Sequence, residues 1–278
     1  MRILVTGANG YLGRGIIKHI LNNNHNVIAA DFAVDYVDDR AEKYCCDLFN
    51  IEDPFNYFGQ PEVLLHLAWR NGFVHYSDVH VTDLSKHYKF IKAFSDSAVK
   101  RIVVMGSMHE VGFFEGCIKE ETPCNPSTPY GISKNALREL TEMLCVQKEK
   151  QFQWLRGFYI VGNNNYGSSI FSKIVAAVAE GKTEFPFTTG KNQFDFLDYD
   201  DFCEQVARAI VQNEINGIIN ICSGYPESLA DRVERFIKDN GYNISLKYGL
   251  FPERPYTSKA VWGDASKIKK IMENCAKA

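Results

Sequence analysis

The sequence lacks the long apolar segment that a membrane-spanning helix requires. No apolar run approaches the roughly 20 residues needed to cross a bilayer. The first ten residues, MRILVTGANG, are typical of a strand followed by a turn and not of a signal peptide. We therefore expect a soluble, cytoplasmic protein that has no membrane partner.

The sequence also lacks basic runs and paired cysteines. Its 31 Lys and Arg residues are interspersed with 34 Asp and Glu residues, and the net charge is -3. This distribution excludes the basic surface that is typical of nucleic-acid-binding proteins. None of the eight cysteines shows C-x-x-C spacing, so we expect no metal site, no disulfide framework and no nucleic-acid partner.

Short apolar runs alternate with segments of helical periodicity in the first 160 residues. A chain of 278 residues that is 45% apolar can form one large domain or two closely joined ones. The expected strands cover residues 2–7, 26–31, 62–69, 100–107 and 152–162. The expected helices between them cover residues 12–25, 77–99 and 130–149. This alternation predicts an α/β fold with a parallel sheet that binds ligands at the carboxyl ends of its strands.

A glycine-rich turn follows the first expected strand. Gly7, Gly10 and Gly13 are spaced three residues apart in TGANGYLG, where missing side chains let the backbone approach a pyrophosphate at a helix N-terminus. The alternative is a turn that only permits close helix packing, but the position directly after a strand favours the dinucleotide site. Asp31 closes the next strand, close to the offset expected for a carboxylate that binds the adenosine ribose. Because this carboxylate would repel a 2′-phosphate, NAD is favoured over NADP.

The pattern loosens after Gly162. We expect a helix at 169–182, a strand and then a helix within 185–212, a strand at 217–224 and a helix at 228–241. The prediction is a Rossmann-type doubly wound parallel sheet with a smaller, interleaved C-terminal substrate region. Residues 1–160, plus about 190–222, would form the NAD-binding domain, and residues 161–189 and 223–278 would form the substrate-binding region.

Tyr130 and Lys134 have a spacing that suits proton transfer. Residues at i and i+4 share one face of a helix, and a nearby ammonium favours the phenolate form of a tyrosine. An ordinary amphipathic helix explains the same spacing, which Tyr88 and Lys92 also show. The surroundings of each pair must therefore decide.

Several motifs in the same order resemble the extended short-chain dehydrogenase/reductase superfamily. The resemblance is strongest to its NAD-dependent epimerase/dehydratase family, which modifies nucleotide sugars. The matching segments are TGANGYLG, CDL at 46–48, LLHLAW at 64–69, VKRIVVMGS at 99–107, PSTPYGISK at 126–134, FDFLDYDDF at 194–202, INICSG at 219–224 and RPYTSKAVWGDASKIKK at 254–270. They span nearly the whole chain.

The resemblance implies a catalytic set of Ser107, Tyr130 and Lys134. Tyr130 would remove a hydroxyl proton while hydride leaves the same carbon for NAD, and Ser107 would hydrogen-bond the reacting oxygen. The implied cofactor-binding residues are Gly7, Asn9, Gly10, Tyr11, Leu12, Gly13, Asp31, Asp47, Leu48, Leu67 and Ala68, together with Tyr130 and Lys134. The implied substrate-binding residues are Ser107, Met108, His109, Tyr159, Asn163 and Arg254. Arg254 matches an arginine that binds the substrate pyrophosphate, although a surface arginine is an equal alternative.

The substrate half departs from the family pattern. Met108 and His109 replace the Asp-Glu pair of the dehydratases, which disfavours dehydration unless His109 or Glu110 substitutes. Tyr159 stands in place of a substrate-binding asparagine, Phe194 in place of an arginine and Asp198 in place of a histidine or tyrosine. We therefore expect a substrate that is unusual in its base, its sugar or its class.

The resemblance favours an NAD-dependent nucleotide-sugar epimerase acting at a sugar hydroxyl carbon, expected to be C4. A nucleotide-sugar 4-ketoreductase or 4-dehydrogenase is the alternative, because both reactions use the same residues. A non-catalytic NAD-binding regulator is disfavoured, since a binding protein does not need all three catalytic residues. The resemblance also implies a homodimer in which the helices at 77–99 and 130–149 form a four-helix bundle.

Overall fold

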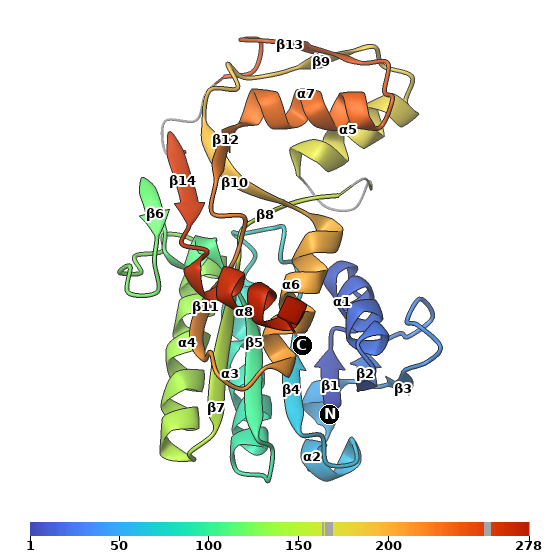
Figure 1. Ribbon diagram of the computed structural model, residues 1–278, viewed down its shortest axis with the longest axis vertical. Coiled ribbons are helices and arrows are strands. Elements are labelled where there is room, and N and C mark those ends of the chain that lie inside the picture. Colours follow the sequence, from blue (N-terminus) through green and yellow to red (C-terminus); the bar gives the residue numbers. More distant parts are fainter. Residues whose placement is uncertain (163, 165–168, 253–256, 278) are drawn as a thin grey trace.

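A seven-stranded parallel sheet forms the centre of the computed structural model, which describes residues 1–162, 164, 169–252 and 257–277 (Figure 1). The strand order is β11-β7-β5-β4-β1-β2-β3. Their bounds are β1 (Arg2–Thr6), β2 (Asn26–Asp31), β3 (Glu42–Cys45), β4 (Val63–His66), β5 (Arg101–Ser107), β7 (Gln151–Gly157) and β11 (Gly217–Ile221). The predicted doubly wound, Rossmann-type fold is confirmed.

The strands are apolar on both faces because helices cover both faces of the sheet. Along β1, Ile3 and Val5 belong to one apolar cluster, and Leu4, between them, belongs to the other. Side chains of a strand alternate between faces, so a central strand such as β1 contributes to two cores. This explains why the strands appear in the sequence as continuous apolar runs.

One face carries α1 (Tyr11–Asn22), and the other carries α3 (Val79–Ser95) and α4 (Pro129–Gln147). Helix α1 packs against α6 (Tyr199–Val211), which in turn contacts α8 (Ser266–Lys277). Helices α3 and α4 pack against each other on the opposite side. The short helices α2 (Pro54–Tyr57), η1 (Leu48–Asn50) and η2 (Met108–Glu110) lie in the connections.

A second group of elements lies beyond the carboxyl ends of the parallel strands, at the top of Figure 1. Its sheet has the order β12-β10-β14-β6, with β8 paired to β10. The bounds are β6 (Gly116–Ile118), β8 (Tyr159–Val161), β10 (Gln193–Asp198), β12 (Pro226–Ser228) and β14 (Ala260–Gly263). Helices α5 (Ile170–Ala179) and α7 (Leu229–Asp239) and the strand pair β9 (Glu184–Pro186) and β13 (Ser245–Lys247) complete it. This group faces the edge of the sheet at which parallel folds bind ligands.

One expected strand is wrong in its extent. The run 152–162 was predicted as a single strand, but the chain leaves the parallel sheet after Gly157 and pairs with β10 from Tyr159 onward. Burial explains the error, because both halves are apolar and an apolar run does not show which sheet a strand joins. The division into residues 1–160 plus about 190–222, and 161–189 with 223–278, stays a prediction.

None of the helices in the described part of the chain has the length and apolar character needed to span a membrane.

Candidate active site

The glycine turn between β1 and α1 is closed against the end of β4. Gly7 has a φ of +69°, and a Cβ there would lie 2.7 Å from the amide nitrogen of Ala68. A Cβ on Gly13 would lie 2.3 Å from the carbonyl oxygen of Gly7. Gly10 is the N-cap of α1 and provides no side-chain cap. The first turn of α1 therefore presents backbone N–H groups and the positive end of the helix dipole at this edge of the sheet, which suits a pyrophosphate.

Asp31 lies beside this turn at the end of β2. One of its carboxylate oxygens accepts a hydrogen bond from the amide of Asn9 at 2.9 Å, and the other accepts one from the amide of Phe32 at 2.8 Å. These bonds fix the carboxylate next to the turn, where a ribose diol of a dinucleotide would bind. The negative charge fits NAD and opposes the additional phosphate of NADP.

The other residues predicted for the cofactor lie on three neighbouring connections. The amide of Cys46 donates to the carbonyl of Asp31 at 2.9 Å, so Asp47 and the buried Leu48 follow directly after a residue bonded to Asp31. Asp47 caps η1 by accepting a bond from the amide of Phe49 at 3.1 Å. Their contacts with the cofactor stay predictions.

The start of α1 and the end of β4 flank the glycine turn. Tyr11 stacks on Tyr199 with a centroid distance of 4.4 Å, and Leu12 packs against the core. The amides of Leu67 and Ala68 bond the carbonyl and the hydroxyl of Thr6 at 3.2 and 3.4 Å. Tyr11, Leu12, Leu67 and Ala68 therefore lie around the glycine turn, and their contacts with the cofactor stay predictions.

The structure brings Ser107, Tyr130 and Lys134 together at the carboxyl end of β5. Ser107 is the last residue of β5, and interaction with its side chain lowers the pKa of Tyr130. Tyr130 lies in the first turn of α4, which begins with Pro129 after the N-cap Thr128. The side chain of Lys134, one turn later, is buried and donates a hydrogen bond to the carbonyl of Met105 at 2.8 Å.

Burial controls the protonation of this pair. It raises the pKa of Tyr130 to about 12, although the hydrogen bond with Ser107 acts in the opposite direction. It lowers the pKa of Lys134 to about 7, against the opposing influence of Glu110. In the protein alone the phenol is therefore protonated at neutral pH. Ionisation of Tyr130 would require additional positive charge beside the phenol, and an oxidised nicotinamide ring bound there would supply it.

Four aromatic rings surround the Tyr130 ring, and the sequence reasoning missed three of them. The His75 ring stacks on it with a centroid distance of 4.9 Å and an interplanar angle of 7°. Trp69, His80 and His109 contact it edge-on, with centroid distances of 6.1, 5.2 and 6.2 Å. No spacing rule indicates these contacts, since Trp69, His75 and His80 come from the connection after β4 and from the start of α3.

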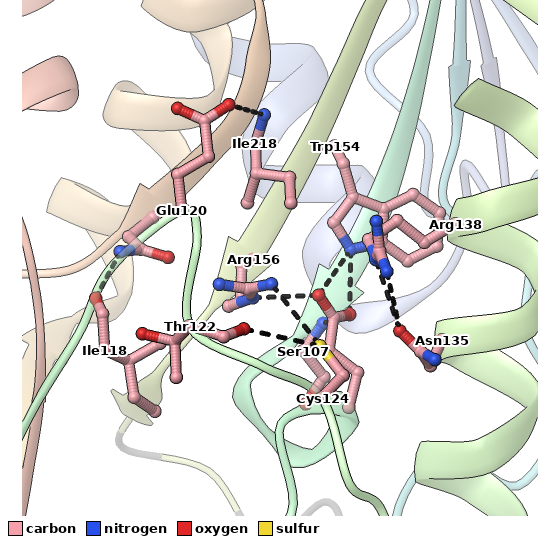
Figure 2. Close-up of polar contacts among 12 residues, drawn as sticks. Ser107, Ile118, Glu120, Thr122, Cys124, Asn135, Arg138, Trp154, Arg156 and Ile218 are labelled. Atoms are coloured by element: carbon pink, nitrogen blue, oxygen red, sulfur yellow. Dashed lines mark hydrogen bonds and ion pairs between the residues drawn. The ribbon is translucent and has the colours of Figure 1, made fainter. Parts of the chain in front are cut away.

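Glu110, which the sequence left as a possible substitute for the dehydratase pair, is fully buried. Its carboxylate accepts bonds from Arg156 Nε at 2.8 Å and from Trp154 Nε1 at 2.9 and 2.8 Å. It also accepts a bond from the amide of Ser107 at 3.2 Å. Figure 2 shows the side chains of Trp154 and Arg156 directed toward this position beside Ser107. Because these bonds occupy the carboxylate, Glu110 does not provide the acid that a dehydratase needs, and it instead fixes the end of β5.

The predicted substrate residues divide into three groups. Met108 and His109 follow Ser107 in η2, and burial lowers the pKa of His109 to about 4. Tyr159 is enclosed by Phe194 and Phe196, with centroid distances of 4.8 and 5.6 Å, and burial raises its pKa to about 12. Asn163 and Arg254 lie outside the described residues.

Comparison with known proteins identifies the family. The family model described as "NAD dependent epimerase/dehydratase family" matches residues 3–222. The chain belongs to this family. It is an NAD-dependent enzyme of the extended short-chain dehydrogenase/reductase type, as the motifs predicted.

Curated relatives of this epimerase/dehydratase chain include both a dehydrogenase and epimerases. A dTDP-6-deoxy-L-talose 4-dehydrogenase (NAD(+)) of Aggregatibacter actinomycetemcomitans is 42% identical over 269 residues, covering 95% of this chain and 99% of the relative. A UDP-glucose 4-epimerase of Bacillus subtilis is 24% identical over 311 residues, covering 98% and 91%.

Solved structures of the family confirm the fold. A UDP-glucose 4-epimerase from Thermotoga maritima superposes with a TM-score of 0.83 at 20% identity, covering 97% of this chain and 92% of that chain. A UDP-glucuronic acid 4-epimerase from Bacillus cereus, in complex with UDP-glucuronic acid and NAD, superposes with a TM-score of 0.82 at 20% identity, covering 98% and 93%.

Proposed function

We propose that this chain transfers hydride between NAD and a hydroxyl-bearing carbon, C4, of the sugar in a nucleotide sugar, with 4-epimerisation as the first candidate. One observation carries the proposal. Buried Ser107 and Lys134 and half-buried Tyr130 lie at the same sheet edge as the glycine turn and Asp31, so a dinucleotide in that turn could place its reactive ring beside the phenol.

The chemistry assigned to the chain is a proton transfer matched to a hydride transfer. Tyr130, ionised with the cofactor present, accepts the hydroxyl proton of the sugar while the carbon–hydrogen bond breaks and its electron pair passes to NAD as hydride. Ser107 orients the reacting oxygen, and Lys134 holds positive charge near the phenolate. An epimerisation would be completed when the keto sugar turns over, hydride returns to the opposite face of C4 and Tyr130 returns the proton to the C4 oxygen. The burial of Lys134 supports this role, because buried charges act more strongly than solvated ones.

Net 4-dehydrogenation, or its reverse, is the second candidate, and a specific observation favours it. The relative at 42% identity is a 4-dehydrogenase of a dTDP-linked 6-deoxy sugar, whereas the epimerase from Bacillus subtilis is 24% identical. In this reaction the keto sugar leaves after a single transfer, and NADH must be exchanged. The Tyr–Lys pair serves both reactions equally.

The residues that replace the family's substrate-binding positions favour a substrate with few charged contacts. Tyr159 and Phe194, which stand where the family pattern has asparagine and arginine, pack against each other instead of presenting polar groups. Asp198, the third departure, forms an ion pair with Arg232. These contacts favour a sugar with apolar surface, such as a 6-deoxyhexose, over a uronic acid.

Assembly and location are part of the same proposal. Helices α3 and α4 pack together and expose Val81, Ile132, Met143 and Val146, with 58, 50, 41 and 74% of their surface accessible. This apolar surface supports a homodimer built as a four-helix bundle, and we place this homodimer in the cytoplasm.

The test starts with the nucleotide that copurifies with the protein. Release and identification of this nucleotide are followed by assays with UDP-, GDP-, CDP- and dTDP-sugars. Product epimers without net NADH support the first candidate, and stoichiometric NADH formation or consumption supports the second. NAD binding without turnover of any nucleotide sugar, in a panel that includes dTDP-6-deoxyhexoses, would refute the proposal and leave an NAD-binding regulator.

A further inference from the structure

We propose that Trp69 is a positioning residue for Lys134, with its indole clamped by α3 so that one ring face holds the buried ammonium at the cofactor site. This contact lies on the side of the site proposed to bind NAD, and its role is the same for epimerisation and for net dehydrogenation. None of the family motifs assigns a role to this side chain.

The contact is close, and the Lys134 side chain that makes it is buried. The Nζ atom of Lys134 lies 3.9 Å from the centroid of the Trp69 ring. A cation over the face of a tryptophan is attracted by the ring electrons, and the attraction is stronger where water is excluded. The hydrogen bond to the carbonyl of Met105 holds the same ammonium at 2.8 Å. Together, the carbonyl and the indole face define where the amine lies, and a third donor direction is left for a ligand hydroxyl.

The indole itself is fixed by two histidines of α3. Its N–H donates to Nδ1 of His80 at 3.0 Å, so this nitrogen must be unprotonated. The hydrogen of the neutral His80 ring then sits on Nε2, which donates to the carbonyl of Val74 at 2.9 Å. The ring of His87 stacks on the indole with a centroid distance of 4.6 Å and an interplanar angle of 18°. The hydrogen bond to His80 and the stacking on His87 therefore hold the Trp69 indole in one orientation.

The clamp is connected to the glycine turn. His87 Nδ1 bonds His66 Nε2 at 2.8 Å, and His66 Nδ1 bonds the Thr6 hydroxyl at 2.8 Å. Thr6 is the residue before Gly7. The position of the indole over Lys134 is thereby coupled through buried side chains to the segment that receives the dinucleotide.

The indole of Trp69 stabilises the charged form of Lys134 in a way that the neighbouring titratable groups do not. Glu110 of η2 favours the ammonium, whereas burial lowers the pKa of Lys134 overall. Burial lowers the pKa of His66 strongly and that of His87 to about 3, and the charge of Lys134 adds to both effects. Both rings are therefore neutral at pH 7, as is the phenol of Tyr130 on the same helix as Lys134. Removal of the indole takes away an attraction that none of these three neutral groups replaces.

The decisive measurement is the pKa of Lys134 in the cofactor-free protein. It is determined by NMR with lysine labelled with ¹³C at Cε, and the Lys134 signal is assigned with a Lys134→Gln variant. We expect Trp69→Leu to lower this pKa by about 1 and Trp69→Phe to lower it by less, because the phenyl ring retains a weaker face. The matched control is Trp262→Phe on β14, which leaves the pKa unchanged. Titration of NAD against the protein should also show weaker binding in Trp69→Leu than in Trp69→Phe.

A purely structural role of Trp69 predicts a different result. In that case the variants lose thermal stability while the Lys134 pKa stays at the wild-type value, and this result would overturn the proposal. His80→Phe tests the clamp separately, because it keeps a ring but removes the acceptor for the indole N–H. If Trp69→Leu does not fold, the test uses Trp69→Phe and His80→Phe. A Lys134 pKa equal to the wild-type value in both variants would refute the proposed role of Trp69.

Discussion

The Glu110–Arg156 pair provides a direct test of how the catalytic end of β5 is held. Both side chains are fully buried, and the Arg156 Nε to Glu110 Oε1 distance is 2.8 Å. Glu110→Gln keeps the size of the side chain and removes its charge, so Arg156 becomes an unpaired buried cation. Removing one partner of a buried pair costs about 3 to 5 kcal/mol. The total free energy of unfolding of a domain is typically about 5 to 15 kcal/mol, so the loss is a large fraction of the stability.

The assay is urea unfolding monitored by tryptophan fluorescence, and Trp154, next to the substituted site, serves as a probe. The matched control is Glu180→Gln, whose ion pair with Lys182 is 60% exposed on both sides and should cost less than about 1 kcal/mol. Adding Arg156→Met to Glu110→Gln removes the unpaired charge and should recover part of the lost stability. If Glu110→Gln unfolds with a free energy within about 1 kcal/mol of the wild type, the proposed burial of the pair is wrong.

Three further predictions concern the cofactor side of the cleft. Gly7→Ala should abolish NAD binding, measured by calorimetry, because its Cβ would lie 2.7 Å from the amide nitrogen of Ala68 at a φ of +69°; NAD affinity equal to wild type would contradict the closed turn. Asp31→Asn should weaken NAD binding and raise the ratio of NADP to NAD affinity, and an unchanged ratio would argue against the ribose role. Lys134→Met should stabilise the cofactor-free protein most at or below pH 7, because burial lowers the pKa of this lysine to about 7 and an unfolded lysine keeps its proton to about 10.4. The gain, measured by urea unfolding, should shrink as the pH rises through this window, and a gain independent of pH would show that the amine is not buried as an ion.

The sequence predicted the parts of the site that depend on local order along the chain. The glycine turn, Asp31 and the Tyr130–Lys134 pair each lie within or directly after one element, so strand-to-helix alternation and helical spacing place them at one sheet edge. The buried Glu110–Arg156 pair could not be predicted, because its partners are 46 residues apart and polar residues are usually exposed.

The Trp69 clamp escaped prediction for a related reason. The LLHLAW segment marks the end of a strand, but no periodicity shows that the indole turns toward Lys134 or that His80 and His87 of α3 enclose it. The separation of β7 from β8 at Phe158 was missed because two strands of different sheets are joined with one residue between them. Contacts between distant segments decide these features, and neither composition nor spacing records such contacts.

The central claim is that the phenol of Tyr130 carries the proton that accompanies hydride transfer. Its most direct test is a single-turnover measurement of NAD reduction or NADH oxidation in Tyr130→Phe, with NAD affinity measured in parallel. Tyr88→Phe is the matched control, because Tyr88 has the same four-residue spacing to a lysine on α3. The account predicts a loss of about 10²- to 10⁴-fold in Tyr130→Phe, retained NAD binding and an unaffected control. Hydride transfer in Tyr130→Phe at the wild-type rate would contradict it.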